Sequence, residues 1–247
     1  MGSVIRSTHP FYVALDPVSL TLSLLDKQSE SITPAIVNQA AAAQIASLRL
    51  HGKTMAEGLT WLKQAIAPLG VDADKVVFLE YPPDDFPDHA LAYGACFDAS
   101  QTHALSELAA YYANTHQVLQ AVIETTEDAS SDRIWPHHFD LATLIMLPVT
   151  QNGNPLTVGV GLSPGDTSYA EPYWYVSPYP YPDTANLPAV SGDGFWHTQH
   201  WVGAVLPTSR LTQNDSAEAQ QQQVESFLHS ALKTSILLLI AGSTDEL

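Results

Sequence analysis

The sequence contains very little cysteine, and this absence limits how the chain can be held together. Cys96 is the single cysteine in 247 residues, so no disulfide can form within the chain. One thiol in a chain of this length is typical of proteins from a reducing compartment. The N-terminus lacks a basic region followed by an apolar run, and no uninterrupted apolar run approaches the roughly 18 residues that span a bilayer. We therefore expect a cytoplasmic protein without a secretory signal or a membrane span.

Basic residues are also scarce. The chain has 9 lysines and arginines against 26 aspartates and glutamates, which gives a formal charge of −17. From Ile134 onward only Arg210 and Lys233 are basic. A surface of this kind repels phosphate backbones and anionic lipid, so nucleic acid and membrane surfaces are not expected as partners. The simpler alternative is that the acidic surface serves solubility.

Several signatures of known chemistry are missing from the sequence. It has no H-E-x-x-H zinc motif, no phosphate-binding P-loop, no G-x-G-x-x-G and no G-x-S-x-G. Any functional site must therefore be argued from individual side chains and their spacing.

Helical and strand periodicities are both present, and they predict an α+β fold. Apolar residues at helical spacing predict helices over 54–69, 100–126 and 216–240, with a short helix over 33–43, and Thr54 with Glu57 has the spacing of a capping box. Apolar runs predict strands over 18–24, 48–50, 76–79, 141–149, 157–162, 173–177 and 200–206, with a hairpin turn at 151–154. We expect an antiparallel sheet of about four strands with flanking helices in the C-terminal half, and a smaller strand and helix N-terminal half.

The chain is expected to form a single domain over residues 1–247. The loop at 81–88, rich in proline and aspartate, is the one candidate for an internal boundary, and it would divide the chain into 1–81 and 90–247.

The string Trp135-Pro-His-His-Phe-Asp140 carries the most unusual group of polar residues. In an extended segment His138 and Asp140 share one face, whereas His137 points to the other. Histidine is a common metal ligand and proton carrier, so these residues fit a metal site or an acid–base pair. They equally fit histidines that bond neighbouring backbone groups. His116, on the apolar face of the long helix, is expected to be a hydrogen-bonded core residue.

Two further segments of the C-terminal half carry similar side chains. His197 and His200 have H-x-x-H spacing, which brings two imidazoles together in a turn but separates them in a strand. Asp166 and Glu171 lie in the connection between two predicted strands; the alternative is a plain turn in which Asp166 bonds its own backbone. Imidazoles and carboxylates together suit a divalent metal such as zinc, manganese or iron. The candidate ligands are His137, His138, Asp140, Glu171, His197 and His200, and the candidate catalytic residues are His138, Asp140, Asp166 and Glu171.

Aromatic residues cluster in the same half and could wall a ligand pocket. The candidates are Trp135, Tyr173, Tyr175, Trp196 and Trp201. The alternative is a sheet that packs aromatic rings on both faces. The glycine pair Gly159 and Gly161 predicts a place where backbone or a ring packs closely in a strand.

Three functions from different classes fit these observations. The first is a small-molecule enzyme, either metal-assisted or a hydrolase that uses a histidine–carboxylate acid–base pair. The second is a binding module that holds a small ligand, a cation included, in an aromatic, acidic pocket without chemistry. The third is a structural or interaction protein whose tryptophans lie in a contact surface. The sequence does not indicate an oligomeric state.

Three strings in the C-terminal half carry a resemblance: RIWPHHFDLATL at 133–144, VGVGLSPGDTSYAEPYWYVSPYPYP at 158–182 and FWHTQHWVGAVLP at 195–207. With them, the chain resembles a group of bacterial proteins of unknown function. The order of features from 48–70 through the closing helix is more distantly similar to a wider bacterial family of the same kind. The resemblance implies a bacterial cytosolic origin and implies no reaction.

Overall fold

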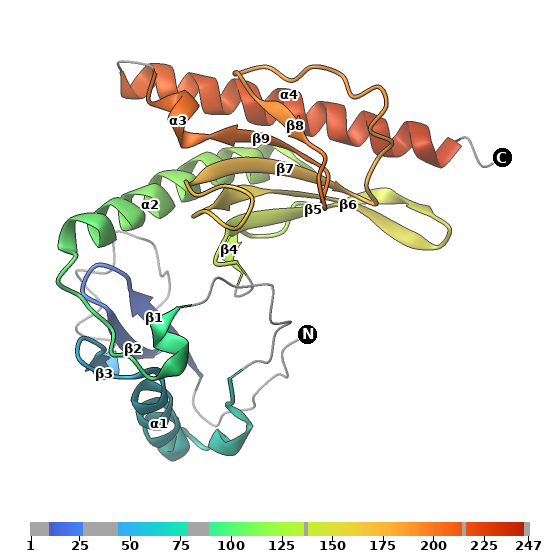
Figure 1. Cartoon of the computed structure of the whole chain (residues 1–247). Helices are drawn as coiled ribbons and strands as arrows, with labels where there is room; N and C mark the ends of the chain where they lie inside the picture. Colours follow the sequence, from blue (N-terminus) through green and yellow to red (C-terminus); the bar gives the residue numbers. More distant parts are fainter. Residues whose placement is uncertain (1–9, 27–43, 79–88, 136–137, 214–215, 245–247) are drawn as a thin grey trace. The chain divides into compact units, whose positions relative to one another are not determined.

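The computed structural model describes residues 10–26, 44–78, 89–135, 138–213 and 216–244 (Figure 1). The chain forms two compact units, residues Met1–Ala113 and Asn114–Leu247. The division falls inside helix α2 (Thr102–Thr125) because one continuous helix carries the chain from the first unit to the second. The loop at 81–88, which the sequence offered as a boundary, lies outside the described residues, as does the short helix expected over 33–43.

The first unit contains a three-stranded antiparallel sheet in the order β1-β2-β3. Its strands are β1 (Phe11–Asp16), β2 (Thr21–Asp26) and β3 (Gln44–Arg49). Helix α1 (Met55–Ile66) follows, and three short 3₁₀ helices come after it: η3 (Ala67–Leu69), η4 (Ala73–Lys75) and η5 (Ala90–Tyr93). Leu24, Ile66 and Val71 form the buried centre of this unit.

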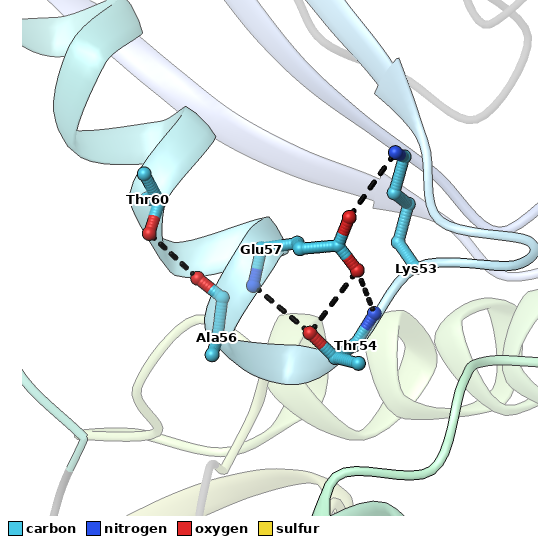
Figure 2. A network of polar contacts seen from close by, with 5 residues as sticks. All are labelled: Lys53, Thr54, Ala56, Glu57 and Thr60. Carbon is cyan, nitrogen blue, oxygen red and sulfur yellow. Dashed lines mark hydrogen bonds and ion pairs between the residues drawn. The ribbon is translucent and has the colours of Figure 1, made fainter.

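Helix α1 begins at the capping box that the sequence predicts (Figure 2). The Glu57 amide donates to Thr54 Oγ1 over 3.2 Å, and the Thr54 amide donates to Glu57 Oε2 over 2.9 Å. Lys53 Nζ lies 3.2 Å from Glu57 Oε1 and so adds an exposed ion pair. These bonds satisfy amides that the first turn of a helix leaves without partners, so local chemistry sets where α1 starts.

The second unit is built on a six-stranded antiparallel sheet in the order β4-β5-β6-β7-β9-β8. This confirms the predicted α+β class and the predicted pairing of the strands at 141–149 and 157–162. The strands are β4 (Arg133–Ile134), β5 (Leu141–Gln151), β6 (Asn154–Ser163), β7 (Tyr173–Tyr179), β8 (Phe195–His197) and β9 (Gly203–Pro207). The β5–β6 hairpin turns at Asn152 and Gly153, which both have positive φ, as a two-residue turn of this sequence requires.

Helices cover one face of this sheet. The short α3 (Thr208–Leu211) leads to α4 (Ala217–Thr244), which lies along the sheet (Figure 1) and packs on β5, β6, β7 and β9. Alternate residues of β6 are fully buried, and their side chains form the apolar face: Leu156, Val158, Val160 and Leu162. The apolar stripe of α4, including Phe227, Leu228 and Ala231, is buried as well. The core of the second unit therefore lies between α4 and this face.

α4 is, among the described helices, the one long and apolar enough to cross a membrane by length and composition. The sequence did not predict it as a span because polar residues interrupt its apolar run and lie on its other side. A core helix of a soluble protein meets the same criterion, and α4 packs on four strands of the sheet.

The sequence was wrong about several strand positions, for local reasons. The alternating segment at 18–24 is only half strand, because Asp16 Oδ1 accepts hydrogen bonds from the amides of Val18 and Ser19 and turns the chain there. Residues 76–78 form no strand. The strand expected from His200 begins at Gly203, because His200 has a φ of 67° that a strand cannot contain. Strands β1, β4 and β8 were not predicted; β4 and β8 are too short to show a period.

Of the glycine pair in β6, Gly161 confirms the predicted close packing and Gly159 does not. A Cβ on Gly161 would contact the Cβ of Ala142 and would lie 2.6 Å from the Leu141 carbonyl oxygen. A Cβ on Gly159 would lie 3.7 Å from the Tyr175 ring, an ordinary contact distance. The two glycines therefore let β5 approach closely at one point and leave open space beside a tyrosine at the next.

Candidate functional site

A cavity of about 240 Å³ opens on the face of the sheet that α4 does not cover. In β5 and the residues before it, alternation places Asp140, Ala142 and Leu144 on this face. Gly159 pairs with Leu144 across the β5–β6 ladder and has no side chain to fill the space between them. The lining residues are Trp135, His138, Asp140, Ala142, Thr143, Leu144, Gly159 and Tyr175.

A tight turn holds the entrance of β5 in place. The Trp135 amide donates to the Asp140 carbonyl over 2.8 Å, and the Phe139 amide donates to the Trp135 carbonyl over 2.9 Å. Phe139 has a φ of 63°, so the segment before β5 is bent rather than extended. The Trp135 indole donates to the Ala142 carbonyl over 3.3 Å. These bonds fix the indole and the Asp140 carboxylate beside each other at the cavity.

Asp140 is the most distinctive group in the cavity. Its Oδ1 atom is buried and has no hydrogen-bond partner among the described residues. Burial raises the pKa of Asp140; the hydrogen bond with Tyr175 and the charge of His138 lower it, whereas the charge of Asp166 raises it further. A buried carboxylate oxygen without a partner is costly, and in native proteins such groups commonly mark a site for a ligand or for water.

Two tyrosines of β7, Tyr175 and Tyr173, are the next polar residues on the same face of the sheet as Asp140. Burial and the Asp140 charge raise the pKa of Tyr175 well above its ordinary value. Burial and the hydrogen bond to Asp166 raise the pKa of Tyr173 as well. Both tyrosines therefore keep neutral hydroxyl groups at physiological pH. Each can donate a hydrogen bond to a carboxylate without losing its proton.

Asp166 organises the loop between β6 and β7. Its Oδ1 accepts from the amides of Ser168 over 2.7 Å and Tyr169 over 3.0 Å, and its Oδ2 accepts from the Tyr173 hydroxyl over 2.7 Å. The expected alternative, a turn in which Asp166 bonds its own backbone, is thus present. With three hydrogen-bond donors, the Asp166 carboxylate serves to hold the loop in place. Its effect on the cavity is electrostatic, because its negative charge raises the pKa of Asp140.

The structure does not bring the predicted metal ligands together. Glu171 accepts from the amide and the hydroxyl of Ser209, over 2.6 and 2.9 Å. His197 contacts the Gln199 carbonyl through Nε2 at 2.6 Å and the Tyr169 hydroxyl through Nδ1 at 2.9 Å. Because a carbonyl only accepts, His197 Nε2 donates and Nδ1 accepts, so neither nitrogen is left for a metal.

This distribution corrects the expectation of a shared metal site. Within the described ranges, no group of three or more histidine, cysteine, aspartate or glutamate residues could hold a metal ion. His137 lies outside them. His138 and Asp140 both line the cavity, although the segment is bent at Phe139 and not extended as their predicted common face required. His197 and Glu171 hydrogen-bond elsewhere, and His200, with a φ of 67°, is not among the lining residues.

The predicted aromatic pocket is formed in part. Trp135 and Tyr175 line the cavity, and Tyr173 lies beside Tyr175 with ring centroids 6.2 Å apart. Trp201 instead stacks on the His197 ring at 4.4 Å. Trp196 donates to the Pro188 carbonyl over 2.7 Å and does not line the cavity.

Sequence reasoning missed four lining residues, Ala142, Thr143, Leu144 and Gly159. The signal for two of them was available, since strand alternation places Ala142 and Leu144 on the same face as Asp140. The contribution of Gly159 depends on cross-strand register, which the sequence alone did not supply.

Two larger depressions carry less chemistry. One, of about 400 Å³ beside α1, contains Glu57, whose carboxylate the capping box already uses. The other, of about 330 Å³ at the end of α4, is lined by Tyr181, Asp183 and helix residues such as Leu238. In the described part of the chain, neither holds a buried polar atom without a partner, whereas the Asp140 cavity does.

Comparison with known proteins adds no assignment to this geometry. No family model matches the chain, and no curated protein and no solved structure matches it. The case for function rests on the cavity itself.

Proposed function

We propose that this protein is a small-molecule binding module whose ligand occupies the cavity at Asp140. The observation that carries the proposal is that Asp140, whose buried Oδ1 has no partner among the described residues, lines an open cavity. Trp135, Leu144 and Tyr175 supply apolar contact area around this one polar anchor. Small-ligand sites have this composition: mostly apolar walls with a few placed polar groups.

The experiment is a ligand-observed NMR screen of the full chain against a fragment library that contains amines, alcohols, amides and carboxylic acids. Each hit is repeated with Gly159→Val, which places two methyl groups into the cavity, and with Thr157→Val, which alters the same strand outside the cavity lining. We expect hits that bind the wild type and Thr157→Val but lose binding to Gly159→Val. A screen without hits, or hits that Gly159→Val still binds, would contradict the proposal.

Acid–base catalysis is the second candidate, and the raised pKa of Asp140 favours it. A carboxyl group whose pKa moves toward neutrality can act as a general acid or base, and His138 beside it offers a second proton-transfer group. Nitrophenyl esters, phosphates and glycosides test for hydrolysis. Activity that Asp140→Asn abolishes would support catalysis, and activity that this variant retains would exclude Asp140 from it.

The acidic charge supports a related proposal about partners, which is that nucleic acid is not one of them. A charge of −17 opposes contact with a phosphate backbone at physiological salt. A gel-shift experiment that shows micromolar affinity for DNA or RNA would contradict it.

A further inference from the structure

The size of the cavity restricts its ligand. Drug-sized ligands occupy pockets of about 300–1,000 Å³. At about 240 Å³ the Asp140 cavity is below that range. Its ligand is therefore no larger than a single aromatic ring, or a short branched chain, with one polar group.

The charge around the cavity restricts the ligand further. No lysine or arginine is among the lining residues, whereas Asp140 lines the cavity and Asp166 lies near enough to raise the pKa of Asp140 by its charge. An anionic ligand would meet two carboxylates in a partly dry site. A cation would offset both, and an N–H donor would form a charge-assisted bond with the Asp140 carboxylate.

The aromatic wall suits the same kind of ligand. The Arg133 guanidinium carbon lies 5.4 Å from the centroid of the Trp135 ring, within the range of a cation–π contact. Trp135 therefore already makes one cation–π contact, with the chain's own Arg133 and not with a ligand. Tyr175 adds a second ring to the lining, so the walls can pack on the hydrocarbon part of an amine while its nitrogen reaches Asp140.

We infer that the cavity selects a small organic ammonium ion, with the ammonium N–H groups donating to the Asp140 carboxylate and the hydrocarbon part between Trp135 and Tyr175. The inference rests on the proposed function, because it names the ligand class of that same cavity. It excludes carboxylates and phosphates as ligands of this site.

The groups around Asp140 set the pH dependence of this binding. His138, Tyr175, Tyr173 and Asp166 are the titratable groups that face Asp140 or act on it through charge. The tyrosines stay neutral, so binding of a cation strengthens as Asp140 ionises. Affinity for an ammonium ion therefore rises with pH over the acidic to neutral range, whereas affinity for a neutral ligand of the same shape does not rise in this way.

The experiment is calorimetric titration of the full chain with three probes of nearly the same shape: benzylamine, benzyl alcohol and benzoate. Asp140→Asn removes the anchoring charge, and Asp74→Asn makes the same charge change at an exposed site in the other unit. We expect benzylamine to bind at least about tenfold more tightly than benzyl alcohol, with benzoate weakest. Asp140→Asn should remove the preference for benzylamine, and Asp74→Asn should keep it.

The outcomes separate the two proposals. Benzyl alcohol that binds as tightly as benzylamine, and that Gly159→Val no longer binds, overturns the ammonium inference and leaves the binding cavity intact. A benzylamine preference that survives in Asp140→Asn also overturns the inference. Failure of all three probes at millimolar concentration overturns the inference, and failure of the whole fragment library overturns the proposed function with it.

Discussion

The Tyr173 hydroxyl donates to Asp166 Oδ2 over 2.7 Å, and this bond joins strand β7 to the loop that precedes it. The Tyr173 side chain is buried, and the same Asp166 carboxylate holds two amides of the loop. One bond therefore fixes both the loop conformation and the start of the strand that carries Tyr175 to the cavity.

Tyr173→Phe should lower the free energy of unfolding by about 1.5–3 kcal/mol, because it removes a hydrogen bond to a charged group and leaves the ring packing intact. Urea unfolding followed by circular dichroism measures this. Tyr179→Phe is the matched control on the same strand, since Tyr179 is 58% exposed, and it should change the stability by less than about 0.5 kcal/mol. Equal effects of the two variants would show that the bond to Asp166 contributes nothing.

Asp140→Asn should make the protein more stable at neutral pH, with a gain on the order of 1 kcal/mol. Burial raises the pKa of Asp140 above its ordinary value, so the folded protein holds this proton more tightly than the unfolded chain does. Its contribution to stability is therefore complete below the unfolded pKa and is lost as pH rises through the folded pKa. The difference between variant and wild type should grow across that range in urea titrations at stepped pH. A constant difference would refute the raised pKa.

Gly161→Ala and Gly159→Ala should have opposite consequences. A Cβ on Gly161 would lie 2.6 Å from the Leu141 carbonyl oxygen, so β5 and β6 must separate, at a cost of about 1–3 kcal/mol. A Cβ on Gly159 meets only the Tyr175 ring at 3.7 Å, and alanine orders a strand better than glycine, so the stability should hold or rise by up to about 1 kcal/mol. Thermal unfolding of both variants measures the contrast. A loss of stability in Gly159→Ala as large as that in Gly161→Ala would contradict it.

His116→Ala should destabilise the second unit by about 1–3 kcal/mol. His116 Nδ1 lies 2.7 Å from Asp132 Oδ2, and the Asp132 side chain is only 8% exposed, so the substitution leaves a buried carboxylate with Gln120 as its remaining partner. Hydrogen exchange of α2 amides reports the loss. His103→Ala, on the same helix at a largely exposed position, should change protection little. A double-mutant cycle with Asp132→Asn tests the pair. If His116→Ala destabilises the Asp132→Asn variant as much as it destabilises the wild type, the two residues are not coupled.

Thr54→Ala should cost about 1 kcal/mol of stability in the first unit, because it removes the side chain that caps the Glu57 amide (Figure 2). Thr60→Ala is the control one turn later, where the hydroxyl only bonds the Ala56 carbonyl within the formed helix. Exchange rates of α1 amides should rise for the first variant alone. If both variants accelerate exchange equally, the cap does not set the start of α1.

Local features were predictable wherever the cause lies within a few residues. The capping box, the turn at Asn152 and Gly153 and the bonded His116 on its helix follow from neighbours along the chain or from helical spacing. Local chemistry also explains a failure: Asp16 bonds two nearby amides and ends the alternation that predicted a longer strand. Helix α4 was predicted from its apolar stripe for the same reason.

The candidate site was predictable only in its central pair. By itself the sequence determined the α+β class, the main helices and the β5–β6 hairpin, because the period of a strand or helix is a property of the backbone. It also named His138 and Asp140 as candidates, but the turn at Phe139, and not strand period, brings both to the cavity. The tertiary structure decided the partners of the other polar residues. Glu171 bonds Ser209 and His197 bonds Tyr169, pairs 38 and 28 residues apart, and these bonds use up the groups that a metal would need. It also decided the cavity, since the space at Gly159 exists only in the register that sets this residue opposite Leu144, and register depends on how whole strands pair.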